Sequence, residues 1–324
     1  MTKLSISVRL FCSLLFCLLA ACSGAAPTPV REPIKVEWTL WQGDYTLLVA
    51  NQMGFFKKHG LNVEPVHYDS VSQAIPDLAG AKLDGGLFTM SDLILATNLT
   101  SLSGVLVSDN GGVYTIVASS DIKSVQDLRG KRIGLNFHTS SEMFVSNMLR
   151  SGRMTSNDVV YVEMSPDQVT QSIPGKADAG LVWEPYTTQA LAQGKKVVYQ
   201  SATNSTLIPK MLVFRNTFIQ QHPEDIRNFV LAWDEAVKYR LSHPQESLAI
   251  ISKATGLPQN ELSLKKDTTI YSIADNAKLF ADRSGKDLNS IYFIFGLNRE
   301  FLITNGYITD PPSVYALLDP SFLK

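Results

Sequence analysis

The chain has 324 residues, of which 45% are hydrophobic and 18% charged, an ordinary composition for a globular protein long enough to form two domains. Its 29 Lys and Arg residues nearly balance its 30 Asp and Glu residues, so we do not expect nucleic acid as a partner. All three cysteines, Cys12, Cys17 and Cys22, lie near the N-terminus. The rest of the chain therefore has no thiol for catalysis, metal binding or a disulfide.

The N-terminal segment has the layout of a secretory signal. Lys3 and Arg9 precede an apolar run, Leu10–Ala21, that is too short to span a bilayer. Leu-Ala-Ala-Cys at residues 19–22 resembles the bacterial lipoprotein processing box, which predicts a signal peptide at 1–21 and a lipid on Cys22. The alternative is an ordinary cleavage after Ala21 that leaves a free thiol. Residues 22–33 carry three prolines among small residues and are predicted to be a tether.

The first folded segment alternates strands and helices. A strand is predicted at 34–40, with Ile34, Val36, Trp38 and Leu40 on one face, followed by a helix at 46–59 that Gly60 ends. A second strand at 61–67, a helix at 71–81 and a strand at 87–88 follow. The loop at 89–92 then leads into a helix at 93–98. Asp92 could cap this helix or reach a ligand, and we expect the cap.

A second segment repeats this order of signals. Residues 131–135 form a predicted strand, and Thr139 to Glu142 have capping-box spacing at the start of a helix that Gly152 ends. Gln-Ser-Ile-Pro at 171–174 and the following Lys-Ala-Asp resemble Gln-Ala-Ile-Pro at 73–76 and the following Lys-Leu-Asp. The matches are short and could be a coincidence. As a repeat they predict two similar α/β lobes whose strand ends face each other across a cleft.

Two crossovers are predicted to connect the lobes. Gly111 and Gly112 allow a sharp turn between strand-like segments at 105–107 and 114–118, and a strand at 207–215 returns the chain. Lobe 1 is therefore expected to comprise 34–112 and 208–324, and lobe 2 to comprise 113–207. A helix at 223–241 carries Trp233 on its buried face. The helical segments after it are interpreted as packing.

The candidate ligand site lies in the loops that follow the strands, where parallel strands of both lobes end. Trp41 and Trp183 could hold a ligand between them or could each fill the core of its own lobe. Free N–H groups at the helix start near Thr139 could bind a ligand, or the cap could satisfy them. The other predicted contact residues are Gln42, Asp44, Tyr45, Ser70, Thr89, Ser91, Tyr114, Ser140, Ser141, Glu184 and Lys210.

The sequence gives little support for an enzyme. The five histidines are scattered, with no metal-ligand spacing and no spacing typical of a catalytic triad. There is no Walker-type phosphate loop and no Gly-x-Ser-x-Gly elbow. We therefore expect no catalytic residue, no metal and no cofactor.

The chain resembles bacterial ABC-transporter solute-binding lipoproteins of the nitrate/sulfonate/taurine class, which are related to thiamine-pyrimidine-precursor binding proteins. The stretches that carry the resemblance are Trp41–Tyr45, Gly54–Leu61, Asp127–Gly134, Trp183–Pro185 and Pro311–Pro320. The resemblance implies an α/β, two-lobed periplasmic-binding-protein fold of type II with two hinge strands and a helical C-terminal region on lobe 1. It also implies a monomer that passes a small-molecule ligand to ABC permease and ATPase subunits.

Two positions depart from the class. Many similar proteins have an aspartate near Tyr114 and another near Lys210, so the hinge of this chain gains positive charge. Lys210 could bind an anionic ligand, or Glu184 or Asp44 could neutralise it. We expect an anionic or zwitterionic solute of the sulfonate, nitrate or pyrimidine type. The alternatives are a ligand sensor that partners a membrane receptor and an enzyme similar to thiamine-pyrimidine synthases.

Overall fold

The computed structural model describes residues 32–137, 139–201, 208–262, 268–283, 285–287 and 289–324. The predicted signal peptide and Cys22 lie outside these residues. The described helices do not include one that is both long enough and apolar enough to cross a membrane.

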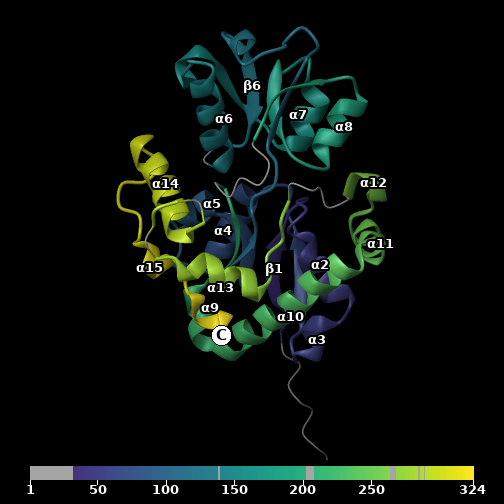
Figure 1. The fold of residues 1–324 in the computed structure, drawn as a ribbon, viewed down its shortest axis with the longest axis vertical. Coiled ribbons are helices and arrows are strands. Elements are labelled where there is room, and N and C mark those ends of the chain that lie inside the picture. The colour runs from purple at the N-terminus through teal and green to yellow at the C-terminus, as the bar shows by residue number, and fades with distance from the viewer. Residues whose placement is uncertain (1–31, 138, 202–207, 263–267, 284, 288) are drawn as a thin grey trace, which may run out of the picture. The chain divides into compact units, whose positions relative to one another are not determined.

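Ten strands form two five-stranded mixed sheets with the same topology (Figure 1). The first has the order β2-β1-β3-β10-β4 and the second the order β7-β6-β8-β5-β9. In each sheet the three strands named first run parallel. The fourth strand, β10 or β5, is antiparallel to both of its neighbours. The strands of the first sheet are β1 (Ile34–Trp38), β2 (Val63–His67), β3 (Gly85–Thr89), β4 (Leu102–Asp109) and β10 (Lys210–Arg215). Those of the second are β5 (Thr115–Ala118), β6 (Arg132–Leu135), β7 (Val160–Glu163), β8 (Ala179–Val182) and β9 (Lys196–Gln200).

This topology confirms the predicted two-lobed α/β fold with two hinge strands. The repeated sequence signals correspond to equivalent strands, because β1, β2 and β3 occupy the same places in the first sheet as β6, β7 and β8 in the second. The second sheet is built only from residues within 113–207, and the first sheet only from residues outside that range. The lobe boundaries themselves stay a prediction.

Helices follow the strands in both segments. In the first segment they are α2 (Tyr45–Gln52), α3 (Phe55–Lys58), α4 (Val71–Ala79) and α5 (Met90–Ala96). In the second they are η1 (Gln126–Leu128), α6 (Ser140–Ser151), η2 (Ser156–Asp158), α7 (Pro166–Ser172) and α8 (Tyr186–Ala192). The single helix predicted at 46–59 is wrong: Gly54 has a φ of +73° and separates α2 from α3. An α-helix cannot continue through a residue in this left-handed conformation, which glycine adopts without strain.

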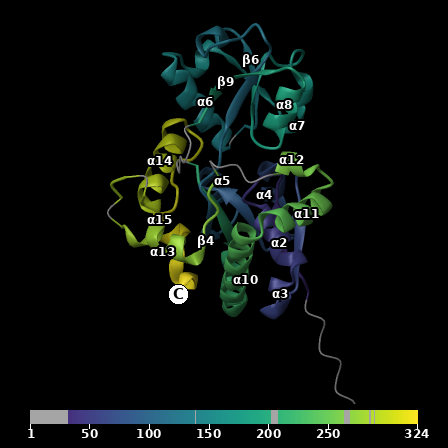
Figure 2. The ribbon, with the colours of Figure 1, turned by 45° about the vertical axis from the view of Figure 1, so that its right-hand side comes forward.

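The C-terminal region is helical, as predicted, and packs on the first sheet and its helices (Figures 1 and 2). Its elements are α9 (Asn216–Gln221), α10 (Pro223–Ser242), α11 (Pro244–Thr255), α12 (Gln259–Leu262), α13 (Ile273–Ala281), α14 (Ile291–Thr304), α15 (Val314–Leu317) and η3 (Pro320–Leu323). The long helix α10 contacts α2 and α3, and α14 contacts α5. Trp233 is only 1% exposed, so its predicted place in the core is confirmed.

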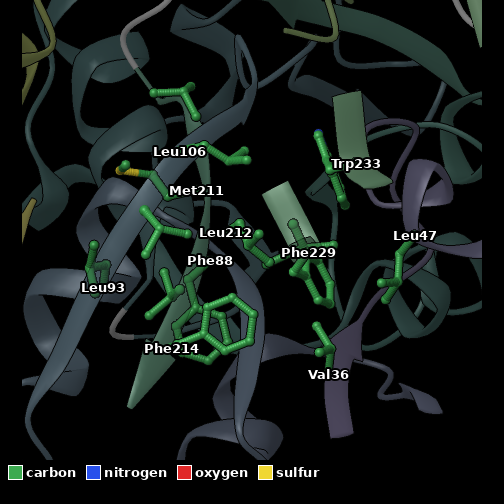
Figure 3. Close-up of a cluster of buried hydrophobic side chains, with 14 of the residues drawn as sticks. Val36, Leu47, Phe88, Leu93, Leu106, Met211, Leu212, Phe214, Phe229 and Trp233 are labelled. Carbon is green, nitrogen blue, oxygen red and sulfur yellow. The ribbon is translucent and has the colours of Figure 1, made fainter. Parts of the chain in front are cut away.

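The main hydrophobic core surrounds the first sheet. Figure 3 shows Val36 of β1, Phe88 of β3 and Phe214 of β10 together with Phe229 and Trp233 of α10. The rings of Phe214 and Phe229 meet at 5.3 Å in an edge-to-face arrangement. Because helices cover both faces of this sheet, its central strands are buried on both sides. Charged residues on these central strands, such as Glu37 and Lys210, are therefore buried as well.

Candidate functional site

A small cavity of about 40 Å³ lies where loops from the two sheets meet. Thr39 and Thr89 line it from the carboxyl ends of β1 and β3, and Asn136 and Trp183 line it from the carboxyl ends of β6 and β8. The carboxyl ends of parallel strands are the usual place for ligands in α/β folds. The predicted contact residues that line the cavity are Trp41, Ser70, Thr89, Tyr114, Thr139, Ser140, Ser141, Trp183 and Lys210.

Three of these residues, Trp41, Tyr114 and Trp183, form what we call the aromatic wall. Their ring centroids are 5.6 to 5.8 Å apart, and both contacts of Trp183 are edge-to-face. The indole N–H of Trp183 donates to the carbonyl of Leu40 at 3.1 Å, which joins a loop of the second sheet to a loop of the first. Gly112 leaves room for the Trp41 ring, because a Cβ at that glycine would lie 2.9 Å from the ring. The two tryptophans therefore lie against each other, and their role in holding a ligand stays a prediction.

Lys210 lies at the centre of a buried charge cluster on the first sheet. Its side chain is 4% exposed, and its ammonium donates to the carboxylate of Asp44 at 2.7 Å. The same oxygen of Asp44 accepts the N–H and the hydroxyl of Thr39, each at 2.9 Å. Of the two alternatives for Lys210, the structure therefore shows neutralisation by Asp44. The carboxylate of Glu184, the other predicted partner, accepts the N–H and hydroxyl of Thr188 at the start of α8.

Two further buried acids complete the cluster. Glu37 of β1 accepts the N–H of Leu87 at 2.9 Å with one carboxyl oxygen, while its other oxygen has no hydrogen-bond partner among the described residues. Asp109 of β4 accepts the indole N–H of Trp41 at 3.1 Å and the N–H of Gly111 at 2.9 Å. The cluster therefore holds the aromatic wall in place through Asp109.

Burial changes the pKa values of these groups. It raises the pKa of Glu37 to about 8, although the charge of Lys210 opposes this effect. It raises the pKa of Asp44 to about 6, again against the effect of Lys210. Burial lowers the pKa of Lys210, but the surrounding carboxylates outweigh it, so the net shift is upward and the ammonium stays charged. At neutral pH we therefore expect Glu37 to be protonated and Lys210 to be charged.

The start of α6 faces the cavity from the second sheet. Its N-cap is Thr139, as predicted, and the hydroxyl oxygen accepts the N–H of Ser141 at 3.2 Å. The hydroxyl of Ser140 lies 3.1 Å from that of Tyr114. Glu142 instead interacts with Tyr307, beyond α14, and this interaction contributes to the raised pKa of Tyr307 after the larger effect of burial. The Thr139 cap thus satisfies one N–H of the helix start and leaves Ser140 at the cavity.

The remaining predicted residues lie elsewhere. Gln42 and Glu184 line a second cavity of about 160 Å³, which shares Trp41 with the first. Asp44, Tyr45 and Ser91 are fully buried and line neither cavity, and their role as ligand contacts stays a prediction. Tyr45 begins α2 and turns into the core of the first sheet, while Ser91 donates to Asn298 at 2.9 Å.

Sequence reasoning missed Glu37, Thr39, Asp109 and Asn136, and for Asp92 it preferred a helix cap to a ligand contact. The predicted cap is wrong, because the N-cap of α5 is Thr89, whose hydroxyl accepts the N–H of Asp92 and donates to its carboxylate. Asp92 lies in the first turn of α5 and lines the cavity. The sequence signal that could have identified Glu37 is a charged residue between the apolar residues of a predicted strand. Among the described residues no cluster of three His, Cys, Asp or Glu side chains could hold a metal ion.

Several curated proteins are similar to this chain. A Bacillus subtilis protein named for binding aliphatic sulfonates is 25% identical over 72% of this chain and 74% of its own length. The taurine-binding periplasmic protein of Escherichia coli is 22% identical over 85% of this chain and 87% of its own. The 4-amino-5-hydroxymethyl-2-methylpyrimidine phosphate synthase of Candida albicans is 22% identical over 81% and 84%.

Solved structures share the fold. The periplasmic aliphatic sulphonate binding protein SsuA of Escherichia coli superposes with a TM-score of 0.68 at 19% identity, covering 88% of this chain and 96% of SsuA. A ligand-binding component of an ABC-type import system from Staphylococcus aureus gives a TM-score of 0.74 at 14% identity, covering 90% of this chain and 98% of its own. Residues 44–247, more than half of the chain, match the family described as NMT1/THI5 like. The chain therefore belongs to the NMT1/THI5-like family and has the periplasmic-binding-protein fold.

Proposed function

We propose that this protein is the extracytoplasmic substrate-binding subunit of an ABC importer and captures a small polar solute by closure of two lobes. The observation that carries this proposal is the cavity whose walls come from the strand ends of both sheets. Relatives named for binding taurine and sulfonates support it, as does the fold shared with an ABC import component. The partners would be a membrane permease and its ATPase.

Closure would act as a switch because a ligand at this position contacts both lobes only when they are together. A ligand shifts such an equilibrium by its difference in affinity for the two states. The hydrogen bond from Trp183 to Leu40 spans the two sets of loops in the structure. We therefore expect the surroundings of the aromatic wall to differ between the open and the closed state.

The function can be tested by a binding screen on the purified protein without its signal peptide. The panel comprises nitrate, taurine, alkanesulfonates, pyrimidines and small amines, and binding is followed by thermal shift and by tryptophan fluorescence. We expect at least one solute to raise the melting temperature and to change the fluorescence of Trp41 and Trp183. If no member of the panel changes either signal at millimolar concentration, the proposal of solute capture fails.

The lipid anchor is a separate proposal. Leu-Ala-Ala-Cys at residues 19–22 supports lipidation of Cys22. We expect the wild-type protein to fractionate with membranes and the Cys22→Ser variant to be released into the soluble fraction. Intact-mass analysis of the wild-type protein should show added lipid. A variant that still fractionates with membranes, together with an unmodified wild-type mass, would refute the anchor.

Two other functions make different predictions. A sensor would use the same cavity but would be recovered with a membrane receptor rather than a permease, which affinity purification from solubilised membranes distinguishes. An enzyme is favoured only by the similarity to the Candida albicans synthase. We propose that this chain is not an enzyme, because its folded body has no cysteine and relatives of similar coverage are named for binding.

A further inference from the structure

The charge of the solute is open in the proposed function, and the structure removes the main argument for an anion. Lys210 was the cation expected to attract one, but its ammonium is already paired with Asp44 at 2.7 Å. Arg240, a second buried cation nearby, donates to the carbonyl of Gln42 and to the hydroxyl of Thr46. Of the two cations, only Lys210 lines the cavity.

Asp92 is the acid that lines the cavity without a cation bonded to it. The residue is 3% exposed. One carboxyl oxygen accepts the Thr89 hydroxyl at 2.6 Å, and the other has no hydrogen-bond partner among the described residues. Burial raises the pKa of this carboxyl group, whereas the Thr89 hydroxyl, the charge of Lys210 and the nearby backbone N–H of Ser140 favour its charged form. A buried carboxylate oxygen without a partner is costly, and a donor on a ligand would remove that cost. A cationic donor would be the strongest partner, because hydrogen bonds between charged groups are stronger than neutral ones.

The aromatic wall lines the same cavity as Asp92. Aromatic faces attract cations, and several rings around one pocket are a common way to bind ammonium groups. The protein already uses one of these rings in this manner, since the ammonium of Lys210 lies 5.7 Å from the ring centroid of Trp41. Rings and carboxylate together therefore favour positive charge in the cavity.

Resting on the proposed function, we propose that the solute carries a protonated or quaternary nitrogen, and that this nitrogen binds between the carboxylate of Asp92 and the aromatic wall. The rings now contact one another and the cavity of about 40 Å³ is small. The nitrogen would therefore enter while the lobes are apart, and closure would bring Asp92 of the first segment and Trp183 of the second together around it.

Asp92→Asn tests the proposal while keeping the shape of the side chain and an acceptor for Thr89. Asp275→Asn is the control, because Asp275 lies in the first turn of α13 and bonds the N-cap residue Ser272 as Asp92 bonds Thr89. Its carboxylate accepts the hydroxyl of Ser272 at 2.6 Å, and its N–H donates to that hydroxyl at 3.2 Å, the same two distances as between Asp92 and Thr89. Each substitution weakens a contact with an N-cap residue and should affect stability, whereas of the two only Asp92 lies at the cavity.

Calorimetric titration would use choline, its neutral isostere with carbon in place of nitrogen, a panel of small primary and quaternary amines, methanesulfonate and nitrate. We expect at least one amine to bind, and the neutral isostere to bind at least tenfold more weakly than choline if choline is that ligand. Asp92→Asn should weaken binding of the amine about ten- to a hundredfold, and Asp275→Asn should leave it unchanged.

Three results would overturn the inference: no amine binds, Asp92→Asn binds the amine as well as the wild type does, or Asp275→Asn weakens binding equally. Binding of methanesulfonate or nitrate without any amine would leave the proposed function intact and refute the cation. Failure of the amines and of both anions would count against the proposed function as well.

Discussion

Glu37 should make the stability of the protein depend on pH. Its pKa is raised from 4.5 to about 8, mainly by burial, so between these values the folded protein keeps a proton that the unfolded chain releases. Stability from this group is complete below about pH 4.5 and falls as pH rises through about 8, by about 1.4 kcal/mol per pH unit for one proton. Between about pH 5.5 and 7.5 the loss should be about 2 to 3 kcal/mol.

Glu37→Gln removes this titration while keeping an oxygen that can accept the N–H of Leu87. We expect the variant and the wild type to have similar free energies of unfolding below about pH 4.5, and the advantage of the variant to grow by about 2 to 3 kcal/mol between pH 5.5 and 7.5. Urea unfolding followed by circular dichroism at several pH values measures the difference.

The exposed acid Glu64 of the neighbouring strand β2 provides the control. Glu64→Gln should change the free energy of unfolding by a similar small amount at every pH. A difference between Glu37→Gln and the wild type that does not grow from pH 5.5 to 7.5 would show that Glu37 is charged in the folded protein. The reasoning from burial would then be wrong.

Two further substitutions test the buried cluster. Lys210→Met should lower the free energy of unfolding by about 3 to 5 kcal/mol, because it leaves the fully buried Asp44 without its cation. Adding Asp44→Asn to this variant should recover part of the loss, which urea unfolding measures. No recovery in the double variant would contradict the pairing. Gly43→Ala should destabilise by about 1 to 3 kcal/mol, because the new Cβ would lie 1.9 Å from a carboxyl oxygen of Asp109; an unchanged melting temperature would contradict this close approach.

The fold could be predicted because its signals are local. Gly60 and Gly152 follow amphipathic helices, and the order strand, helix, strand occurs twice along the chain. The start of α6 at Ser140 follows from the Thr139 cap. The break at Gly54 was missed because a glycine after apolar residues is compatible with a helix until its φ is known.

The cavity could be predicted only in part. The sequence indicates which loops lie together, but it does not show which buried side chains form hydrogen bonds or ion pairs with each other. Trp41 and Trp183 follow strands, and of the two alternatives for them the structure has their rings in contact. Glu37 alternates with the apolar residues of β1, a pattern typical of a solvent-exposed face. It is buried because β1 lies between β2 and β3 with helices on both faces, which is a property of the assembled sheet. The pairing of Lys210 with Asp44 likewise depends on contacts between distant segments.

The place of β10 in the first sheet has a consequence for the order of folding. The second sheet is built from one continuous stretch, from Thr115 to Gln200. In the first sheet, β10 lies between β3 and β4, which do not pair with each other, and it begins only at Lys210. The whole second sheet therefore precedes β10 along the chain, so we expect the second sheet to form before the first is complete when the chain is synthesised from its N-terminus. A chain that ended after Gln200 would leave an empty position in the middle of the first sheet.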